Sequence, residues 1–124
     1  MGYREKLPAD CPPGTAHDGE CGEAYRLLPN KVPIAADFAS NAAKQEAIPP
    51  GADPCRWASC SLFTDMDALN KTRTTFKKLR KFKYVAQVKI VAGSGRLLVE
   101  NTHIDFWMFD TFDPMTSIVH VTEL

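Results

Sequence analysis

Apolar and polar residues alternate over several segments of this chain, and the alternation predicts β-strands. The clearest segment is 84–91, in which the polar residues Gln87 and Lys89 alternate with small and β-branched apolar residues. Gly93-Ser94-Gly95 follows this segment and predicts a turn. The other predicted strands are 23–28, 56–63, 96–99, 103–109 and 117–123.

One main helix is predicted, over about residues 65–81. Its apolar residues recur at spacings of three and seven and would form one stripe, made of Met66, Leu69, Phe76 and Leu79. Thr64 is placed to cap the first turn, with Asp67 three residues later as in a capping box. Four cations in the last turn would complement the helix dipole: Lys77, Lys78, Arg80 and Lys81.

Two segments show no clear periodicity. Residues 1–22 are rich in Pro, Gly, Asp and Cys, which predicts an irregular N-terminal arm. Residues 31–54 form a long connection of the kind that is often functional, and within it Ser40 either lies in an extended piece or caps a short helix. We therefore expect one α+β domain over 23–124, with a largely antiparallel sheet of five or six strands.

The composition agrees with one compact domain. The chain has 124 residues, 44% of them hydrophobic and 24% charged. No apolar run approaches the roughly 20 residues that a membrane-spanning helix needs. The first six residues have no apolar signal-peptide core, so we expect a cytoplasmic protein without a membrane partner.

Four cysteines raise the question of disulfides or a metal. Cys11 and Cys21 are ten positions apart, and Cys55 and Cys60 are five apart, so neither pair has zinc-knuckle spacing. Because a reducing compartment disfavours disulfides, ordinary free or buried thiols are the favoured interpretation, and a zinc site is the alternative. A divalent metal held by Asp105, Asp110 and Asp113 is a further alternative, although Asp113-Pro114 is also typical of a turn.

The formal net charge is zero, yet the charges are segregated. Residues 71–83 hold seven cations and no acid, and after Arg96 the chain has no Lys or Arg. A basic face and an acidic face are expected, which suit a protein partner, self-association or an anionic ligand. The basic run could also bind nucleic acid, through Lys77, Lys78, Arg80 and Lys81, although a solvated helix face is the commoner explanation.

Residues 102–114 carry the densest set of functional side chains. Alternation over 103–109 places Ile104, Phe106 and Met108 on a core face. The other face carries His103, Asp105, Trp107 and Phe109, which are candidates for a ligand pocket with a titratable histidine. The alternative is a second core layer packed under residues 31–54.

Three further residues are candidates for chemistry. Arg26 is the polar residue between apolar neighbours in strand 23–28, either an anion-binding group or a solvated edge residue. Ser61 or Cys60 could form a nucleophilic pair with His103, although no G-x-S-x-G motif surrounds them. No motif indicates a particular cofactor.

The order of short motifs resembles a group of small bacterial proteins without an established activity. The shared features are an arginine-bearing first strand at Tyr25-Arg26-Leu27-Leu28, a Ser-hydrophobic-Phe strand at Ser61-Leu62-Phe63, and a late His-x-x-x-Trp at 103–107. The chain is also remotely similar to the ADP-ribosyltransferase-like fold, with Arg26, Ser61 and His103 at the matching positions. That resemblance implies a transferase whose late glutamate would have to be supplied by Glu100 or Asp105.

Three functions follow from these observations. The first is a bacterial binding or accessory protein whose pocket is lined by strand 103–109. The second is an enzyme of nucleotide chemistry, in which Arg26 holds a phosphate and His103 and Asp105 lie near the reacting atoms. The third is a nucleic-acid binder that uses the basic run.

Overall fold

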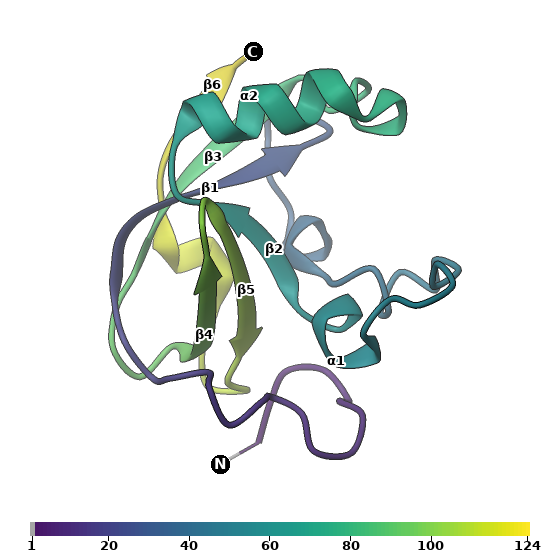
Figure 1. Cartoon of the computed structure of the whole chain (residues 1–124). Coiled ribbons are helices and arrows are strands. Elements are labelled where there is room, and N and C mark those ends of the chain that lie inside the picture. The colour runs from purple at the N-terminus through teal and green to yellow at the C-terminus, as the bar shows by residue number, and fades with distance from the viewer. Residues whose placement is uncertain (1) are drawn as a thin grey trace.

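The computed structural model describes residues 2–124, and within them the chain forms one six-stranded sheet of order β4-β5-β2-β1-β3-β6. Every neighbouring pair is antiparallel. The strands are β1 (Cys21–Leu28), β2 (Cys60–Phe63), β3 (Tyr84–Ile90), β4 (Gly95–Glu100), β5 (His103–Met108) and β6 (Ile118–Glu123). With one main helix, α2 (Met66–Thr75), this is the α+β fold that the sequence predicts (Figure 1).

The strand predicted over 56–63 is wrong in its first half, because residues Pro54–Trp57 form a short helix, α1. Asp53 caps α1 by accepting a hydrogen bond from the Cys55 amide, and Pro54 occupies the first turn, where its missing N–H leaves no helix bond unmade. Three 3-10 turns complete the described secondary structure: η1 (Ala35–Phe38), η2 (Lys77–Leu79) and η3 (Pro114–Ser117). Within residues 2–124 no helix has the length and apolar character to cross a membrane.

Helix α2 begins close to the predicted position, but Asp65 rather than Thr64 caps it. Leu69 is fully buried, in a cluster with Leu27, Phe63 and Val85 beneath the helix. The regular helix ends at Thr75, and Phe76 is 57% exposed, so Phe76 does not belong to the apolar stripe as predicted. The hydroxyls of the last two threonines bond back to helix carbonyls, an arrangement that weakens regular helix at this end.

The sheet opens between β1 and β2. In the described residues their ladder consists of the pair Tyr25–Phe63, whereas the ladder of β1 and β3 runs from Cys21 to Leu28. Strands β4, β5 and β2 therefore meet β1, β3 and β6 over a short contact. Beyond that contact, the Arg26 side chain, rather than the β1 backbone, donates a hydrogen bond to a carbonyl of β2. The opening between the two strands positions the candidate site.

The main core lies on the face of β5 that alternation predicts. Ile104, Phe106 and Met108 are buried in one cluster with residues of β1, β2, β3 and β4. Strand β5 ends at Met108, so Phe109, which the predicted strand over 103–109 includes, lies just outside it, and its amide donates to the Ser94 carbonyl.

The N-terminal arm is wrapped on the domain. It forms bridges from Tyr3 to Phe109, just after β5, and from His17 to Leu97, within β4. In Figure 1 the first part of the arm lies beside α1 at the bottom of the molecule, at the opposite end from α2, and the chain then runs up one side to β1. The arm's backbone is therefore committed to its own domain at these positions.

Candidate functional site

A pocket of about 510 Å³ lies where the sheet opens. Its lining comes from three places: the strands β1, β2 and β5, the central connection over 41–49 with Trp57, and the end of α2 with η2. The volume falls within the range that small-molecule sites occupy. The long central connection that the sequence marks as functional thus forms part of the pocket lining.

The pocket combines positive charge with aromatic rings. Its cations are Arg26, Lys44, Lys78 and Lys81, and the acidic residue among its lining is Glu46. Its aromatic side chains are Trp57, Phe63, Phe76 and Phe82. Burial, and after it the neighbouring Arg26 charge, lowers the pKa of Lys44, as expected where two cations lie close together.

Arg26 crosses the opening of the sheet. Its Nε donates to the Asp37 carbonyl at 3.0 Å, and its two terminal nitrogens donate to the carbonyls of Ser61 at 2.8 Å and Ala39 at 3.2 Å. The guanidinium thus replaces ladder bonds between β1 and β2 and ties the central connection to both. Arg26 is neither a solvated edge residue nor fully available to a ligand, but its charge lies in the lining of the pocket.

Ser61 and His103 lie side by side in the pocket, and Ser61 Oγ is hydrogen-bonded to His103 Nε2. The imidazole also packs edge-on against Phe63, with 5.7 Å between ring centroids. Burial lowers the pKa of His103, although the Asp105 carboxylate opposes the shift. A neutral imidazole against a hydroxyl can accept its proton, so the pair can perform general-base chemistry.

Asp105 is 2% exposed and lies behind the Ser61–His103 pair as seen from the pocket. Its carboxylate accepts from Arg56 Nε and from Ser59 Oγ, both at 2.7 Å, and lies 3.8 Å from His103 Nδ1. The last distance is too long for a hydrogen bond, so the contact is electrostatic. Partial burial acts to lower the pKa of Arg56, but Asp105 and Glu100 outweigh it and raise that pKa. Asp105 is therefore a supporting group rather than a lining one.

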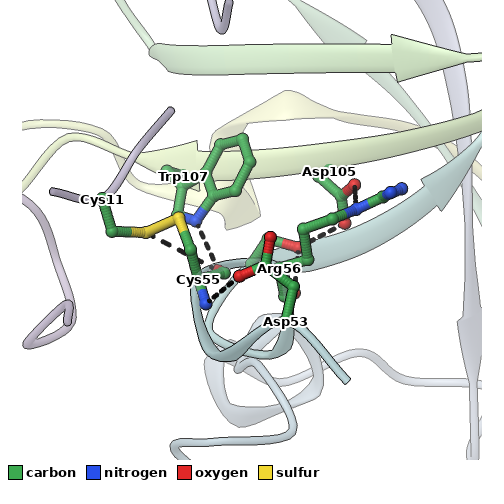
Figure 2. Close-up of a disulfide and its surroundings, with 7 residues drawn as sticks. Cys11, Asp53, Cys55, Arg56, Asp105 and Trp107 are labelled. Atoms are coloured by element: carbon green, nitrogen blue, oxygen red, sulfur yellow. Dashed lines mark hydrogen bonds and ion pairs between the residues drawn. A yellow bond between two sulfur atoms is a disulfide. The ribbon is translucent and has the colours of Figure 1, made fainter. Parts of the chain in front are cut away.

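Trp107 also lies away from the pocket. It is 2% exposed, and its indole donates to the Cys55 carbonyl at 3.0 Å (Figure 2). The strand face predicted to line one site is thus divided: His103 faces the pocket, and Trp107 packs next to α1 and the Cys11–Cys55 bond.

The cysteines do not pair within either of the two sequence-adjacent sets, Cys11 with Cys21 or Cys55 with Cys60. Cys11 forms a disulfide with Cys55, while Cys21 and Cys60 are free. The prediction of ordinary thiols is therefore wrong for Cys11 and Cys55, because the arm folds back onto α1 and brings them together. Cys60 is the buried thiol that the prediction describes, and burial raises its pKa.

The described residues contain no cluster of three or more His, Cys, Asp or Glu that could hold a metal. The cysteines do not gather as a zinc site, because two of them form the disulfide. Asp113 caps η3 by accepting from the Met115 amide at 3.0 Å, which is the turn role that Asp113-Pro114 indicates. Asp105 is bonded to Arg56 and Ser59.

The structure brings together Arg26, Ser61 and His103 among the predicted residues, and Lys78 and Lys81 among the predicted nucleic-acid contacts. Cys60 lies in the main core cluster, so it is not the partner of His103. Sequence reasoning missed Lys44, Trp57 and Phe82 as lining residues. The length of the 31–54 connection was a usable signal for Lys44, whereas nothing local distinguishes Trp57 from a core tryptophan.

Acidification should destabilise the fold partly through His103. Its folded-state pKa lies below the ordinary 6.5, so the unfolded chain takes up the proton first. The stability that the neutral His103 contributes is therefore fully present above about pH 6.5. It is lost as the pH falls through the lowered pKa of the folded state. Urea unfolding between about pH 7.5 and pH 5 should show a smaller loss for His103→Gln than for the wild type. His120→Gln, at an exposed position on β6, should follow the wild type; equal losses in all three proteins would refute the burial-driven shift.

Comparison of the chain with models of known protein families, with curated proteins and with solved structures finds no match.

Proposed function

We propose that the protein binds a small anionic ligand with a planar ring system, as a nucleotide has, in the pocket between the sheet, the central connection and η2. One observation carries the proposal: cations and aromatic side chains line the same pocket, around a hydroxyl–imidazole pair. This ligand class satisfies both features, because phosphates bind cations and bases stack on aromatic rings.

The charge pattern supports an anion in particular. Burial and, after it, the Arg26 charge lower the pKa of Lys44, so the two cations lie near each other in the lining and repel each other. An anion bound near them would offset that repulsion. Lys78 and Lys81 add charge from η2 and the residues that follow it.

A catalytic role is the second candidate, and the Ser61–His103 hydrogen bond favours it. Arg26, Ser61 and His103 are the positions that match the ADP-ribosyltransferase-like resemblance, and all three line the pocket. Glu100 and Asp105 are both paired with Arg56, so either would have to exchange that partner to act as the late acid. We therefore place ligand binding first and nucleotide chemistry second.

We also propose a cellular compartment for the protein. The compartment expected from the sequence is the cytoplasm. The Cys11–Cys55 disulfide favours an oxidising compartment, where such bonds persist. We give the disulfide more weight than that expectation, because it is a specific covalent bond.

Calorimetric titration with adenine and nicotinamide nucleotides tests the proposal. At about 100 times the dissociation constant, a bound nucleotide should stabilise the fold by about 2.7 kcal/mol and raise its melting temperature by several degrees. Lys44→Glu/Lys78→Glu should bind at least about tenfold more weakly, because it reverses two charges that line the pocket. Lys89→Glu, at an exposed position on β3, is the matched control and should bind as the wild type does. Silence across the nucleotides, or equal affinity in all three proteins, would refute the proposal.

A further inference from the structure

We infer that the pocket receives one nucleotide of a single-stranded nucleic acid, whose backbone continues along the basic segment 71–83. This inference rests on the proposed function and extends it, because it names the molecule to which the bound nucleotide belongs.

The first observation is that the pocket lies beside the basic segment 71–83. Six of its lining residues come from the same segment that holds seven cations and no acid: Thr72, Phe76, Lys78, Leu79, Lys81 and Phe82. Other cations of that segment are exposed but lie outside the pocket lining: Lys71, Lys77, Arg80 and Lys83. A free nucleotide in the pocket would leave the positive charge of these four residues without a phosphate to neutralise it. A polymer with phosphates on both sides of the bound nucleotide would neutralise it.

The second observation is an exposed aromatic side chain at the pocket. Phe76 is 57% exposed, and among the exposed large apolar side chains of residues 2–124 it is the aromatic one. It lies between cations in the sequence, and Lys81 places its ammonium 5.5 Å from the centroid of the Phe82 ring. Aromatic rings interleaved with cations form the stacking surfaces on which single strands bind, at about 1–3 kcal/mol per stacked base.

The shape of the site favours a single strand over a duplex. A pocket of about 510 Å³ can hold a base only after that base has left its stack. A single strand allows this at a smaller free-energy cost than a paired duplex does. The segment is also a helix end followed by a 3-10 turn, with α2 packed on the sheet through Leu69 rather than standing free to enter a groove.

Fluorescence anisotropy with labelled oligonucleotides of about 12 bases, in DNA and RNA forms, tests the inference. The expected result is at least about tenfold tighter binding of a single strand than of a mononucleotide competitor, with affinity that falls steeply as salt rises. A duplex of the same length should bind more weakly than the single strand.

Variants separate this inference from the proposed function. Lys77→Glu/Lys83→Glu lies outside the pocket lining, so it should weaken the oligonucleotide at least about tenfold and leave mononucleotide affinity unchanged. Lys89→Glu should change neither affinity. If the mononucleotide binds but the oligonucleotide binds no more tightly, or the double variant has no effect, the inference is overturned and the pocket proposal stands. If neither ligand binds, both are overturned.

Discussion

Removal of the Cys11–Cys55 disulfide should lower the free energy of unfolding by about 4 kcal/mol. The bond joins residues 44 positions apart, and a closed loop of that length removes about 13 cal/mol/K of entropy from the unfolded chain. It also fastens the arm to α1, whose Cys55 carbonyl accepts from the Trp107 indole. Chemical unfolding of Cys11→Ser/Cys55→Ser and of the wild type, under the same conditions, measures the difference.

Two controls make the disulfide result specific. Cys21→Ser removes a free thiol and should change stability by no more than about 0.5 kcal/mol. Reduction of the wild type should reproduce the loss seen in the double variant. A double variant as stable as the wild type would show that the bond adds no constraint, and the arm would then be held by its other contacts, among them the bridges to Phe109 and Leu97 and the Glu5 carboxylate that accepts from Ser40.

Arg56→Ala should cost about 3 kcal/mol of stability, the second largest expected effect. Asp105 is 2% exposed, and without Arg56 its carboxylate keeps the Ser59 hydroxyl as its remaining hydrogen-bond donor. A buried charge that loses its partner is more harmful than the pair is stabilising. We take the lower end of the usual range, because Arg56 itself is partly exposed and water can approach the site. Thermal and urea unfolding both measure the loss.

The matched control removes the exposed partner of the same arginine. Glu100→Gln removes the negative charge from the 3.3 Å ion pair with Arg56, but Glu100 lies at the surface, so the loss should stay below about 1 kcal/mol. Arg56→Lys should fall between the two variants, because it keeps the charge and loses the planar fork. If Arg56→Ala were no less stable than Glu100→Gln, then Asp105 would not depend on Arg56.

Much of the fold could be predicted from local patterns. Alternation located β3 and β5, and it placed Ile104, Phe106 and Met108 in the core, because a strand with one fully buried face leaves a period of two in the sequence. Apolar spacings of three and seven located the main helix, whose Leu69 is buried. The end of that helix was harder to predict. The hydroxyls of Thr74 and Thr75 hydrogen-bond to helix carbonyls and weaken the helix there, although the run of cations continues the helical sequence pattern.

The site was only partly predictable, because it depends on contacts between distant segments. His103 and Ser61 could be named as candidates, but their hydrogen bond follows from the pairing of β2 with β5, which is set by the whole sheet. The disulfide depends on the arm folding back over 44 positions, and the composition of the arm does not encode that path. Trp57 and Lys44 line the pocket because α1 and the central connection fold over the opening of the sheet.

The central claim is that the pocket at the opening of the sheet binds a nucleotide, and amide chemical-shift mapping of the oxidised protein tests it most directly. Addition of an adenine nucleotide should perturb the amides of Ser61 and His103, together with those of segments 41–46 and 72–82. The amides of β6 should stay unchanged, because no residue of β6 lies among the pocket lining. No perturbation at saturating ligand, or perturbations confined to surfaces away from Ser61 and His103, would contradict the claim.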